Sequence, residues 1–352
     1  MIPEHRPTRL PVFLASALSK IYSIGINRQN ARYDRGVNVT QLKRPVISIG
    51  NISAGGTGKT PMVQHIVKIL LEHGRHPVIA MRGYKSKPGV AGDEQLEHMQ
   101  ALPDVPVVAQ PDRIAGLNML FSSDEGKQVD CVVLDDGFQH RKIQRDLDIV
   151  LIDASRPPTC DALLPLGFLR EPMSSLKRAD VIVLTHAEQV TQAQLDALTA
   201  TIQVHIEGQE ILIAEHEWTA LLRAEWDTSR EQYETQHNDV ESLRGVRAAI
   251  LTGIGHPEAF ASMASDHGVQ AVHRCDRPDH SAYTSAFLSS FLRDSKARGA
   301  ECILTTQKDW SKIRQLHPDS LNQEQIPFCI PFLGIRFLDG GNCLSESVKS
   351  AF

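Results

Sequence analysis

The chain has 352 residues, of which 41% are hydrophobic and 22% are charged, and these proportions are ordinary for a soluble α/β protein. Its length is sufficient for two domains, each with its own core. The six cysteines are scattered along the sequence and include no CxxC pair. This arrangement argues against a zinc ribbon or a disulfide framework and suits a reducing cytoplasm.

Charge is unevenly distributed along the sequence. Residues 1–44 carry eight Lys and Arg side chains against two acidic ones, a local balance of +6, whereas the whole chain has a net charge of −5. A basic N-terminal segment on an acidic body predicts an anionic partner for that segment, either membrane phospholipid or nucleic acid.

Residues 10–26, LPVFLASALSKIYSIGI, place apolar side chains at helical three- and four-residue steps. Ser16, Lys20 and Ser23 interrupt the run, so it cannot cross a bilayer, which needs about 20 apolar residues. Two interpretations stay open: an amphipathic helix lying on a membrane surface, and a helix packed on the protein's own core. Single-stranded nucleic acid is a weaker alternative, because few aromatic residues accompany the basic ones.

From residue 45 the sequence alternates short apolar strands with helical segments, as in a parallel sheet covered by helices. Near-continuous apolar runs are typical of strands buried on both faces. Residues 206–240 are charged and read as helix or loop, although 210–214 also fits a strand. Strands are expected at 45–49, 78–81, 107–109, 131–134, 149–152 and 181–184, with helices at 59–73 and 112–121.

A second α/β pattern has strands at 248–252, 269–272 and 303–305, with helices from Pro257 and from Ser281. Residues 326–337 are expected to pair with 210–214 as a connector. The predicted divisions are an N-terminal membrane-associated helix and basic segment (1–44), a P-loop kinase core (45–216), a smaller α/β domain (217–325) and a return connector with the C-terminal segment (326–352). The expected fold class is α/β: a P-loop NTPase-like parallel sheet with helices on both faces, a second smaller α/β domain and an N-terminal amphipathic helix.

Residues 53–60, SAGGTGKT, follow a predicted strand and open a predicted helix, the context of the phosphate-binding loop G-x-x-x-x-G-K-[ST]. Ser53 replaces the first glycine of this pattern. The glycines let backbone N–H groups turn toward phosphate oxygens, and the helix N-terminus adds its positive dipole end. Lys59 is expected to reach the β- and γ-phosphates of ATP, and the Thr60 hydroxyl to bind Mg²⁺. The predicted nucleotide-binding residues are Ser53, Ala54, Gly55, Gly56, Thr57, Gly58, Lys59 and Thr60.

Two adjacent aspartates, Asp135 and Asp136, end the strand at 131–134. A P-loop protein needs an acid near its metal, usually at the end of a neighbouring apolar strand. Adjacent carboxylates repel each other, so a divalent cation is a natural compensation. A turn at Asp136 is the alternative, but beside a P-loop we favour the metal role, with Asp153 as a weaker duplicate.

Gly92-Asp93-Glu94 follows a basic stretch, residues 82–89, of the kind that can close over an anionic substrate. From residue types alone, Asp93 and Glu94 are interpreted as solvated loop residues.

Eight motifs, in order along the chain, resemble those of the tetraacyldisaccharide 4′-kinase family of Gram-negative bacteria. They are SIGNISAGGTGKTP (48–61), MRGY (81–84), AGDE (91–94), DDGFQHR (135–141), LLPLGFLREP (163–172), GIGHPEAF (253–260), PDHSAY (278–283) and TTQKD (305–309). The resemblance implies transfer of the γ-phosphoryl group of ATP to the 4′-hydroxyl of a tetraacyldisaccharide 1-phosphate, forming lipid IVA in lipid A biosynthesis. It also implies a helix docked on the cytoplasmic face of the inner membrane, no nucleic-acid partner and no obligate protein partner.

The resemblance also implies roles for individual residues. Asp93 matches the family's proposed catalytic base and His280 the histidine that assists it, with Lys59 as the third catalytic group. The two residues lie in different predicted domains, which implies domain closure. The residues expected to hold Mg²⁺ are Thr60, Asp135, Asp136 and Glu171. The residues expected to contact the substrate are Arg82, Tyr84, Arg113, His140, Arg141 and Arg170.

The sequence departs from the family pattern at three places. Gln95 stands where the family often has proline, Gln307 where it often has glutamate, and the stretch between MRGY and AGDE is short. The role of residues 305–309 stays open between the nucleotide and a hinge. Two alternative functions are a P-loop GTPase or metallochaperone-type switch, whose guanine-reading NKxD motif is absent at 306–309, and a soluble sugar kinase.

Overall fold

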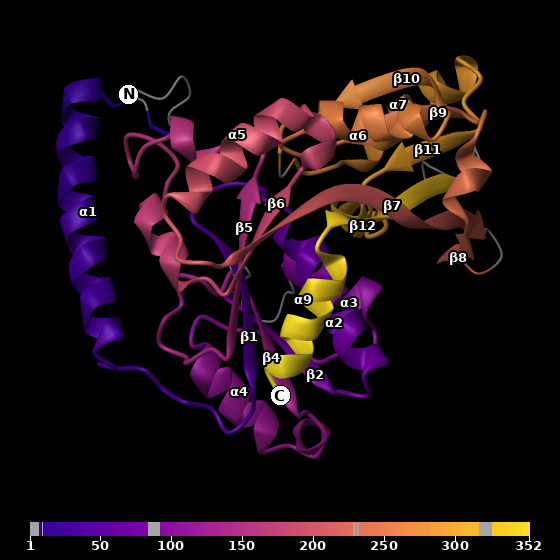
Figure 1. Cartoon of the computed structure of the whole chain (residues 1–352). Coiled ribbons are helices and arrows are strands. Elements are labelled where there is room, and N and C mark those ends of the chain that lie inside the picture. Colours follow the sequence, from indigo (N-terminus) through magenta and orange to yellow (C-terminus); the bar gives the residue numbers. More distant parts are fainter. Residues whose placement is uncertain are drawn as a thin grey trace. The chain divides into compact units, whose positions relative to one another are not determined.

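The computed structural model describes residues 7–8, 10–83, 92–227, 230, 232–279, 281–316 and 326–352. The chain forms two compact units: unit 1 is Met1–His216 with Ile335–Phe352, and unit 2 is Glu217–Gly334. Two long strands, β7 (Glu210–Asp227) and β12 (Phe328–Asp339), carry the chain from one unit to the other and are neighbours in the sheet (Figure 1).

Unit 1 is built on a parallel sheet with the strand order β7-β6-β5-β1-β4-β2-β3. Every residue of β1, β2, β4, β5 and β6 is buried, which for β4, β5 and β6 confirms the prediction of strands buried on both faces. The bounds are β1 (Val46–Asn51), β2 (Pro77–Met81), β3 (Val107–Ala109), β4 (Cys131–Asp135), β5 (Leu147–Asp153) and β6 (Val181–Thr185).

Helices cover both faces of this sheet, because successive strand residues point to opposite sides. On one face, Ile47 and Ile49 pack against α2 and α9, and α3 lies beside α2. On the other face, Val46 packs with α4 and Val150 packs with α5. The helices of unit 1 are α1 (Val12–Asp34), α2 (Lys59–Glu72), α3 (Asp93–Ala101), α4 (Arg113–Phe121), α5 (Gln192–Gln203) and α9 (Gly341–Ser350), with short 3-10 turns at Glu125–Lys127, Pro158–Cys160, Met173–Arg178 and Ala187–Gln189.

Helix α1 turns its small and polar side chains, rather than its large apolar ones, toward unit 1. Ala15 and Ser19 are its buried residues, whereas Phe13, Ile21 and Ile24 are exposed. Within the described residues, no helix is long and apolar enough to cross a membrane.

Unit 2 repeats the α/β pattern with parallel strands in the order β10-β9-β11-β12. Helices α7 and α8 share one apolar cluster with β9, β11 and β12, and α6 shares another on the opposite side of the same strands. The bounds are β9 (Arg247–Thr252), β10 (Gln270–Asp276), β11 (Cys302–Thr305), α6 (Pro257–Asp266), α7 (Ser285–Ala297), α8 (Gln307–Ile313) and a 3-10 turn at Val240–Leu243.

The reading of residues 206–240 as helix or loop was wrong. Most of the segment belongs to β7 and to β8 (Gln232–Asn238), which pair antiparallel. Along β7 the alternate residues Leu212, Ala214, His216 and Trp218 are buried, and the charged residues between them, Glu215 and Glu217, lie on the other face of the strand. The helix expected from Ser281 also begins later, at Ser285, because the Thr284 hydroxyl caps it by accepting from the Phe287 N–H.

Candidate active site

The phosphate loop connects β1 to α2 and has glycine at two positions with positive φ. Gly55 has φ +137° and Gly58 has φ +76°, values that favour glycine. A Cβ at Gly58 would lie 2.5 Å from Nε2 of the buried His216, whereas a Cβ at Gly55 or Gly56 would have nothing within 4 Å. The loop therefore packs tightly at its helix end and is open over Gly55 and Gly56.

Thr57 anchors the loop to the sheet beneath it. Its hydroxyl accepts a hydrogen bond from Asn51 Nδ2 at 2.9 Å, and its carbonyl accepts one from Thr185 Oγ1 at 3.1 Å. On the other side, the Ala54 N–H donates to the Phe168 carbonyl at 2.7 Å. These bonds, which include the Thr57 carbonyl and the Ala54 N–H of the backbone, fix the shape of the loop from two sides.

Asp136 lies beside the loop and is surrounded by cationic side chains. Lys59 Nζ is 3.7 Å from Oδ1, and Arg170 Nη1 donates to both carboxylate oxygens. Arg113, which is buried, donates to the Asp136 carbonyl at 3.3 Å. Burial alone would raise the pKa of Asp136, but Lys59 and Arg170 outweigh it and lower that pKa below its ordinary value. The carboxylate is therefore ionised at neutral pH.

Asp135 has a different environment from its neighbour. Its side chain is 5% exposed, and Oδ2 lies 3.1 Å from Nε2 of His98, a fully buried residue of α3. The two aspartates that the sequence placed together are thus held by different partners.

The chemistry of this set of residues fits a nucleoside triphosphate with Mg²⁺. The open glycine backbone and Lys59 suit phosphate oxygens, and the Thr60 hydroxyl and the aspartate oxygens are ligands that Mg²⁺ prefers. Within the described residues, no group of three or more His, Cys, Asp or Glu side chains is arranged to hold a metal. A metal here would need the hydroxyl of Thr60 and the phosphates in addition to the carboxylates.

Asp93 is the first residue of α3, and Gly92 is the N-cap. This position replaces the reading of Asp93 as a loop residue, because a carboxylate in the first helical turn is stabilised by the helix dipole. Arg82 follows β2 directly and is exposed. Tyr84 and His280, predicted for substrate binding and catalysis, lie outside the described residues.

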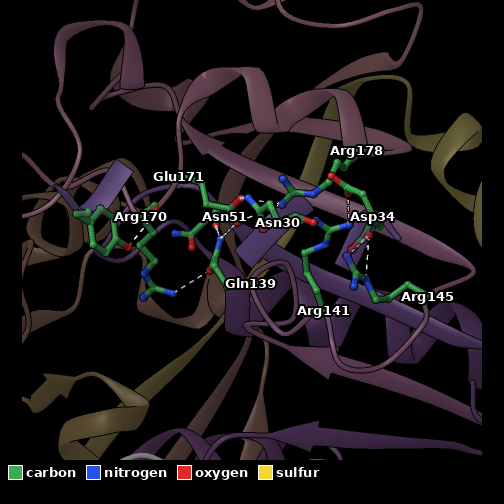
Figure 2. Close-up of polar contacts among 11 residues, drawn as sticks. Asn30, Asp34, Asn51, Gln139, Arg141, Arg145, Arg170, Glu171 and Arg178 are labelled. Atoms are coloured by element: carbon green, nitrogen blue, oxygen red, sulfur yellow. Dashed lines mark hydrogen bonds and ion pairs between the residues drawn. The ribbon is translucent and has the colours of Figure 1, made fainter. Parts of the chain in front are cut away.

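The expectation that Glu171 binds Mg²⁺ finds no support in its surroundings (Figure 2). The residue is 1% exposed, and both carboxylate oxygens accept hydrogen bonds from Arg178, at 3.1 and 2.9 Å. Asn30 of α1 donates to Oε2 at 2.8 Å, and Gln139 donates to Oε1 at 3.1 Å. This carboxylate already accepts four hydrogen bonds, one of which links the 163–172 segment to α1.

Two of the expected substrate arginines also bind the protein itself. Arg141 donates to the Asn30 carbonyl at 3.2 Å and to the Asp34 carboxylate at 2.7 Å, so it fastens α1 (Figure 2). Arg113 is 3% exposed and supports the turn at Asp136. Arg170 is more open, with 28% of its side chain exposed.

His140 is half-buried, and its environment keeps it neutral. Burial, together with the charges of Arg113, Lys142 and Arg145, lowers its pKa to about 4. A neutral imidazole can accept or donate a hydrogen bond to a sugar, but it does not provide the positive charge that phosphate binding would use.

Asp153, the weaker metal candidate, faces other partners. Its Oδ1 accepts from the Ser155 hydroxyl at 2.6 Å and lies 3.3 Å from His186 Nδ1. It stabilises the turn after β5.

The TTQKD motif lies in unit 2, where its Asp309 contacts two other motifs, 253–260 and 278–283. Asp309 is fully buried and accepts hydrogen bonds from the Gly253 N–H, the Tyr283 hydroxyl and the Thr306 hydroxyl, at 2.9, 2.9 and 2.7 Å. Lys308 Nζ lies 2.6 Å from Asp279 Oδ1. The motif therefore binds Asp279 and Tyr283, which lie on either side of position 280 in the sequence.

Several supporting residues escaped prediction from the sequence. Asn51 and Gln139 lie inside matched motifs, which was the signal available for them. His98, Arg178 and His216 belong to no motif, and their importance comes from distant partners. Asn51 donates a hydrogen bond to Thr57, and both Gln139 and Arg178 donate to Glu171. His98 contacts Asp135, and His216 packs against Gly58.

A parallel sheet, a glycine-rich loop that opens α2, and an acidic pair at the end of the strand next to β1 define a P-loop phosphotransferase. A family model described as tetraacyldisaccharide-1-P 4′-kinase matches residues 12–333. The chain belongs to this family.

Individual relatives agree with this assignment. A tetraacyldisaccharide 4′-kinase of Syntrophus aciditrophicus is 33% identical over 338 residues, covering 88% of this chain and 87% of that protein. One of Anaeromyxobacter dehalogenans is 35% identical over 298 residues, covering 80% and 76%. A crystal structure of the Aquifex aeolicus LpxK protein, an "apo" form in complex with ATP, superposes with a TM-score of 0.68 at 27% identity, covering 96% of this chain and 98% of that one.

Proposed function

We propose that this chain transfers the γ-phosphoryl group of ATP to the 4′-hydroxyl of tetraacyldisaccharide 1-phosphate, the step that forms lipid IVA in lipid A biosynthesis. The observation that carries the proposal is the convergence of Lys59 and Arg170 on Asp136, next to Asp135, beside the phosphate loop. Family membership supplies the acceptor.

In this proposal one set of residues binds the phosphates of ATP and another acts on the acceptor. Lys59 and the loop backbone hold the β- and γ-phosphates, and Arg170 neutralises charge that develops on the transferred group. Asp93 accepts the proton of the 4′-hydroxyl as its oxygen bonds to the γ-phosphorus and the bond to the β-phosphate oxygen breaks. Thr60, Asp135 and Asp136 would hold Mg²⁺, which neutralises phosphate charge when bound.

The acceptor side of the site is less completely defined. Among the described residues, Asp93, Arg82 and Arg170 are the proposed contacts of the acceptor, and Tyr84 and His280 are further candidates from the motif matches. Asp93 belongs to unit 1, and position 280 falls in the sequence range of unit 2.

The N-terminal helix is the proposed contact with the cytoplasmic face of the inner membrane. Phe13, Ile21 and Ile24 of α1 are 77%, 65% and 53% exposed, while the opposite face makes hydrogen bonds to unit 1. An exposed apolar face next to basic side chains such as Lys20 and Arg28 suits a helix lying among lipid headgroups. The alternative in which these apolar residues pack on the protein's own core does not agree with their exposure.

A transfer assay tests the reaction. Protein in detergent would be supplied with ATP, Mg²⁺ and tetraacyldisaccharide 1-phosphate, and the lipid products separated by mass. A lipid heavier by one phosphate is expected, with release of ADP in equal amount. Folded protein that hydrolyses ATP without forming this lipid would favour a nucleotide switch instead.

A deletion tests the membrane contact. Removing residues 1–26 is expected to release the protein from anionic vesicles in a flotation assay, because the exposed apolar residues are lost. Residues Asn30 and Asp34, which bind unit 1, are retained in this variant. Unchanged flotation of the folded variant would assign the lipid contact to another surface.

A further inference from the structure

We propose that His98 is a positioning residue for the magnesium site, holding the carboxylate of Asp135 through one oxygen so that the other is available to the metal. The inference rests on the proposed role of Asp135 as a metal ligand. No motif includes His98, and the proposed reaction assigns it no part.

The contact joins two buried groups. Nε2 of His98 lies 3.1 Å from Oδ2 of Asp135, and the two side chains are 0% and 5% exposed. A carboxylate accepts hydrogen bonds, so the ring must carry a proton on Nε2 to make this contact. A directed hydrogen bond of this kind limits rotation of the carboxylate about its Cβ–Cγ bond.

Asp135 and Asp136 have different contacts, and we infer different roles for them. Asp136 already faces Lys59 and Arg170, whose positive charges oppose a cation at the same oxygens. Among the described residues, no Lys or Arg lies within ion-pair distance of Asp135, and the close contact of its carboxylate is with His98, while Arg113 and Glu94 also interact with its charge. The geometry therefore points to Asp135 as the direct ligand and to Asp136 as the partner of the phosphate-binding cations.

Carboxylates that bind metals are commonly oriented by outer hydrogen-bond partners, and loss of such a partner typically costs about 10–100-fold in metal affinity or activity. His98 is such an outer partner, and it lies on α3, whereas the proposed metal ligand Asp135 ends β4. The same helix begins at Asp93, five residues or about 7.5 Å earlier along its axis. One hydrogen bond thus fixes α3, and with it the proposed base, relative to the acidic end of β4.

A role in stability alone is the competing explanation, because removing one member of a buried polar pair leaves the other unpaired. The two explanations differ in what they predict for the folded protein. A purely structural histidine would change the free energy of unfolding and leave Mg²⁺ affinity as it was. A positioning histidine changes Mg²⁺ affinity even where the protein is fully folded.

The experiment is a Mg²⁺ titration of the full chain with a non-hydrolysable ATP analogue bound, followed by calorimetry, with Mn²⁺ electron paramagnetic resonance as a second readout. The variants are His98→Leu, His98→Asn and His98→Gln. His65→Leu is the matched control, since His65 lies on the neighbouring helix α2 and contacts the Phe337 ring. Asp135→Asn reports on the metal site itself.

His98→Leu and the shorter His98→Asn are expected to bind Mg²⁺ at least about 10-fold more weakly, as is Asp135→Asn. His98→Gln, whose amide can reach Asp135, should recover most of the affinity, and His65→Leu should match the wild type. All variants should bind the analogue alike without metal.

The inference is overturned if Asp135→Asn loses Mg²⁺ affinity while folded His98→Leu or His98→Asn keeps it. If Asp135→Asn also keeps full affinity, the proposed metal site itself is wrong and the role of His98 falls with it. Because neither readout involves phosphoryl transfer, failure of the lipid reaction is measured separately.

Discussion

Arg170 holds the carboxylate of Asp136, with Nη1 2.9 Å from Oδ1 and 2.8 Å from Oδ2. The carbonyl of the same arginine accepts a hydrogen bond from the Tyr22 hydroxyl of α1 at 2.9 Å. One residue therefore connects the N-terminal helix to the acidic end of β4.

Replacing Arg170 with glutamine is expected to lower kcat by about 100-fold, because a cation next to the reacting phosphate and to Asp136 is lost. Steady-state kinetics with purified lipid acceptor would measure the effect. Arg156→Gln, at an exposed arginine, serves as the control. Equal rates for the two variants would contradict a role for Arg170 in transfer.

Asp93→Asn is expected to reduce kcat by about 100-fold or more while ATP affinity stays within about twofold, since its carboxylate acts on the acceptor. The comparison needs kcat from product formation and an ATP dissociation constant from calorimetry. Asp104→Asn, at an exposed aspartate, should leave both quantities unchanged. A variant that lost ATP binding and kept kcat would assign Asp93 to the nucleotide instead.

Glu171→Gln is expected to destabilise the fold by about 3–5 kcal/mol, because it leaves the charge of Arg178 buried without its partner. Urea unfolding would measure this loss. Lys127→Met breaks a pair whose side chains are 70% and 96% exposed, and should cost less than about 0.5 kcal/mol. Should Glu171→Gln instead weaken Mg²⁺ binding without loss of stability, the original metal role would return.

The low pKa of His140, about 4, predicts a pH dependence of stability. Below the ordinary histidine pKa of about 6.5 the unfolded chain binds a proton that the folded chain refuses until about pH 4. The unfolded state therefore holds more protons, and stability falls as the pH is lowered through this window. His140→Gln should lose less unfolding free energy than the wild type between about pH 7 and about pH 5.

The measurement for His140 is urea unfolding at both pH values. His76→Gln, at an exposed histidine, is the control and should behave like the wild type. An identical pH dependence in His140→Gln and the wild type would mean that folding leaves the pKa of His140 unchanged.

The exposed face of α1 predicts a surface-specific effect on lipid binding. Phe13→Ser with Ile21→Ser should lower the vesicle partition coefficient at least about 10-fold, because burial of each large apolar side chain contributes about 1.5–3 kcal/mol. Met119→Ser with Val204→Ser is the matched control, since these residues are 74% and 80% exposed elsewhere on unit 1. Comparable losses from both double variants would show that general hydrophobicity, not α1, drives binding.

Much of the fold follows from local patterns in the sequence. The apolar runs that became β4, β5 and β6 are buried over their whole length, so composition alone located them. In β7 the pattern was hidden, because Glu215 and Glu217 alternate with buried residues and made the segment look charged overall. A period of two over a long strand is easily mistaken for a polar loop when one of its faces carries charge.

Site residues were predictable where the reactive side chains lie within one short segment. They were less predictable where a side chain's environment comes from residues far away in the sequence. The phosphate loop and the aspartate pair each lie within a few residues. Glu171 matched a motif, but its environment comes from Asn30, which is 141 positions away. His98 carried no local signal, because a histidine within a helix is usually a packing residue.

The hydrogen bonds of α1 have a consequence for how the enzyme would sit on a bilayer. Apolar packing tolerates sliding and rotation, whereas the bonds from Ser19 to Leu163 and from Tyr22 to Arg170 allow a single rotational setting of the helix. The side chains of Phe13 and Ile21 therefore project from unit 1 in one direction. If they enter the lipid, these two hydroxyl contacts, together with the bonds that Asn30 and Asp34 make to unit 1, set the rotational orientation of the phosphate-binding edge relative to the membrane plane.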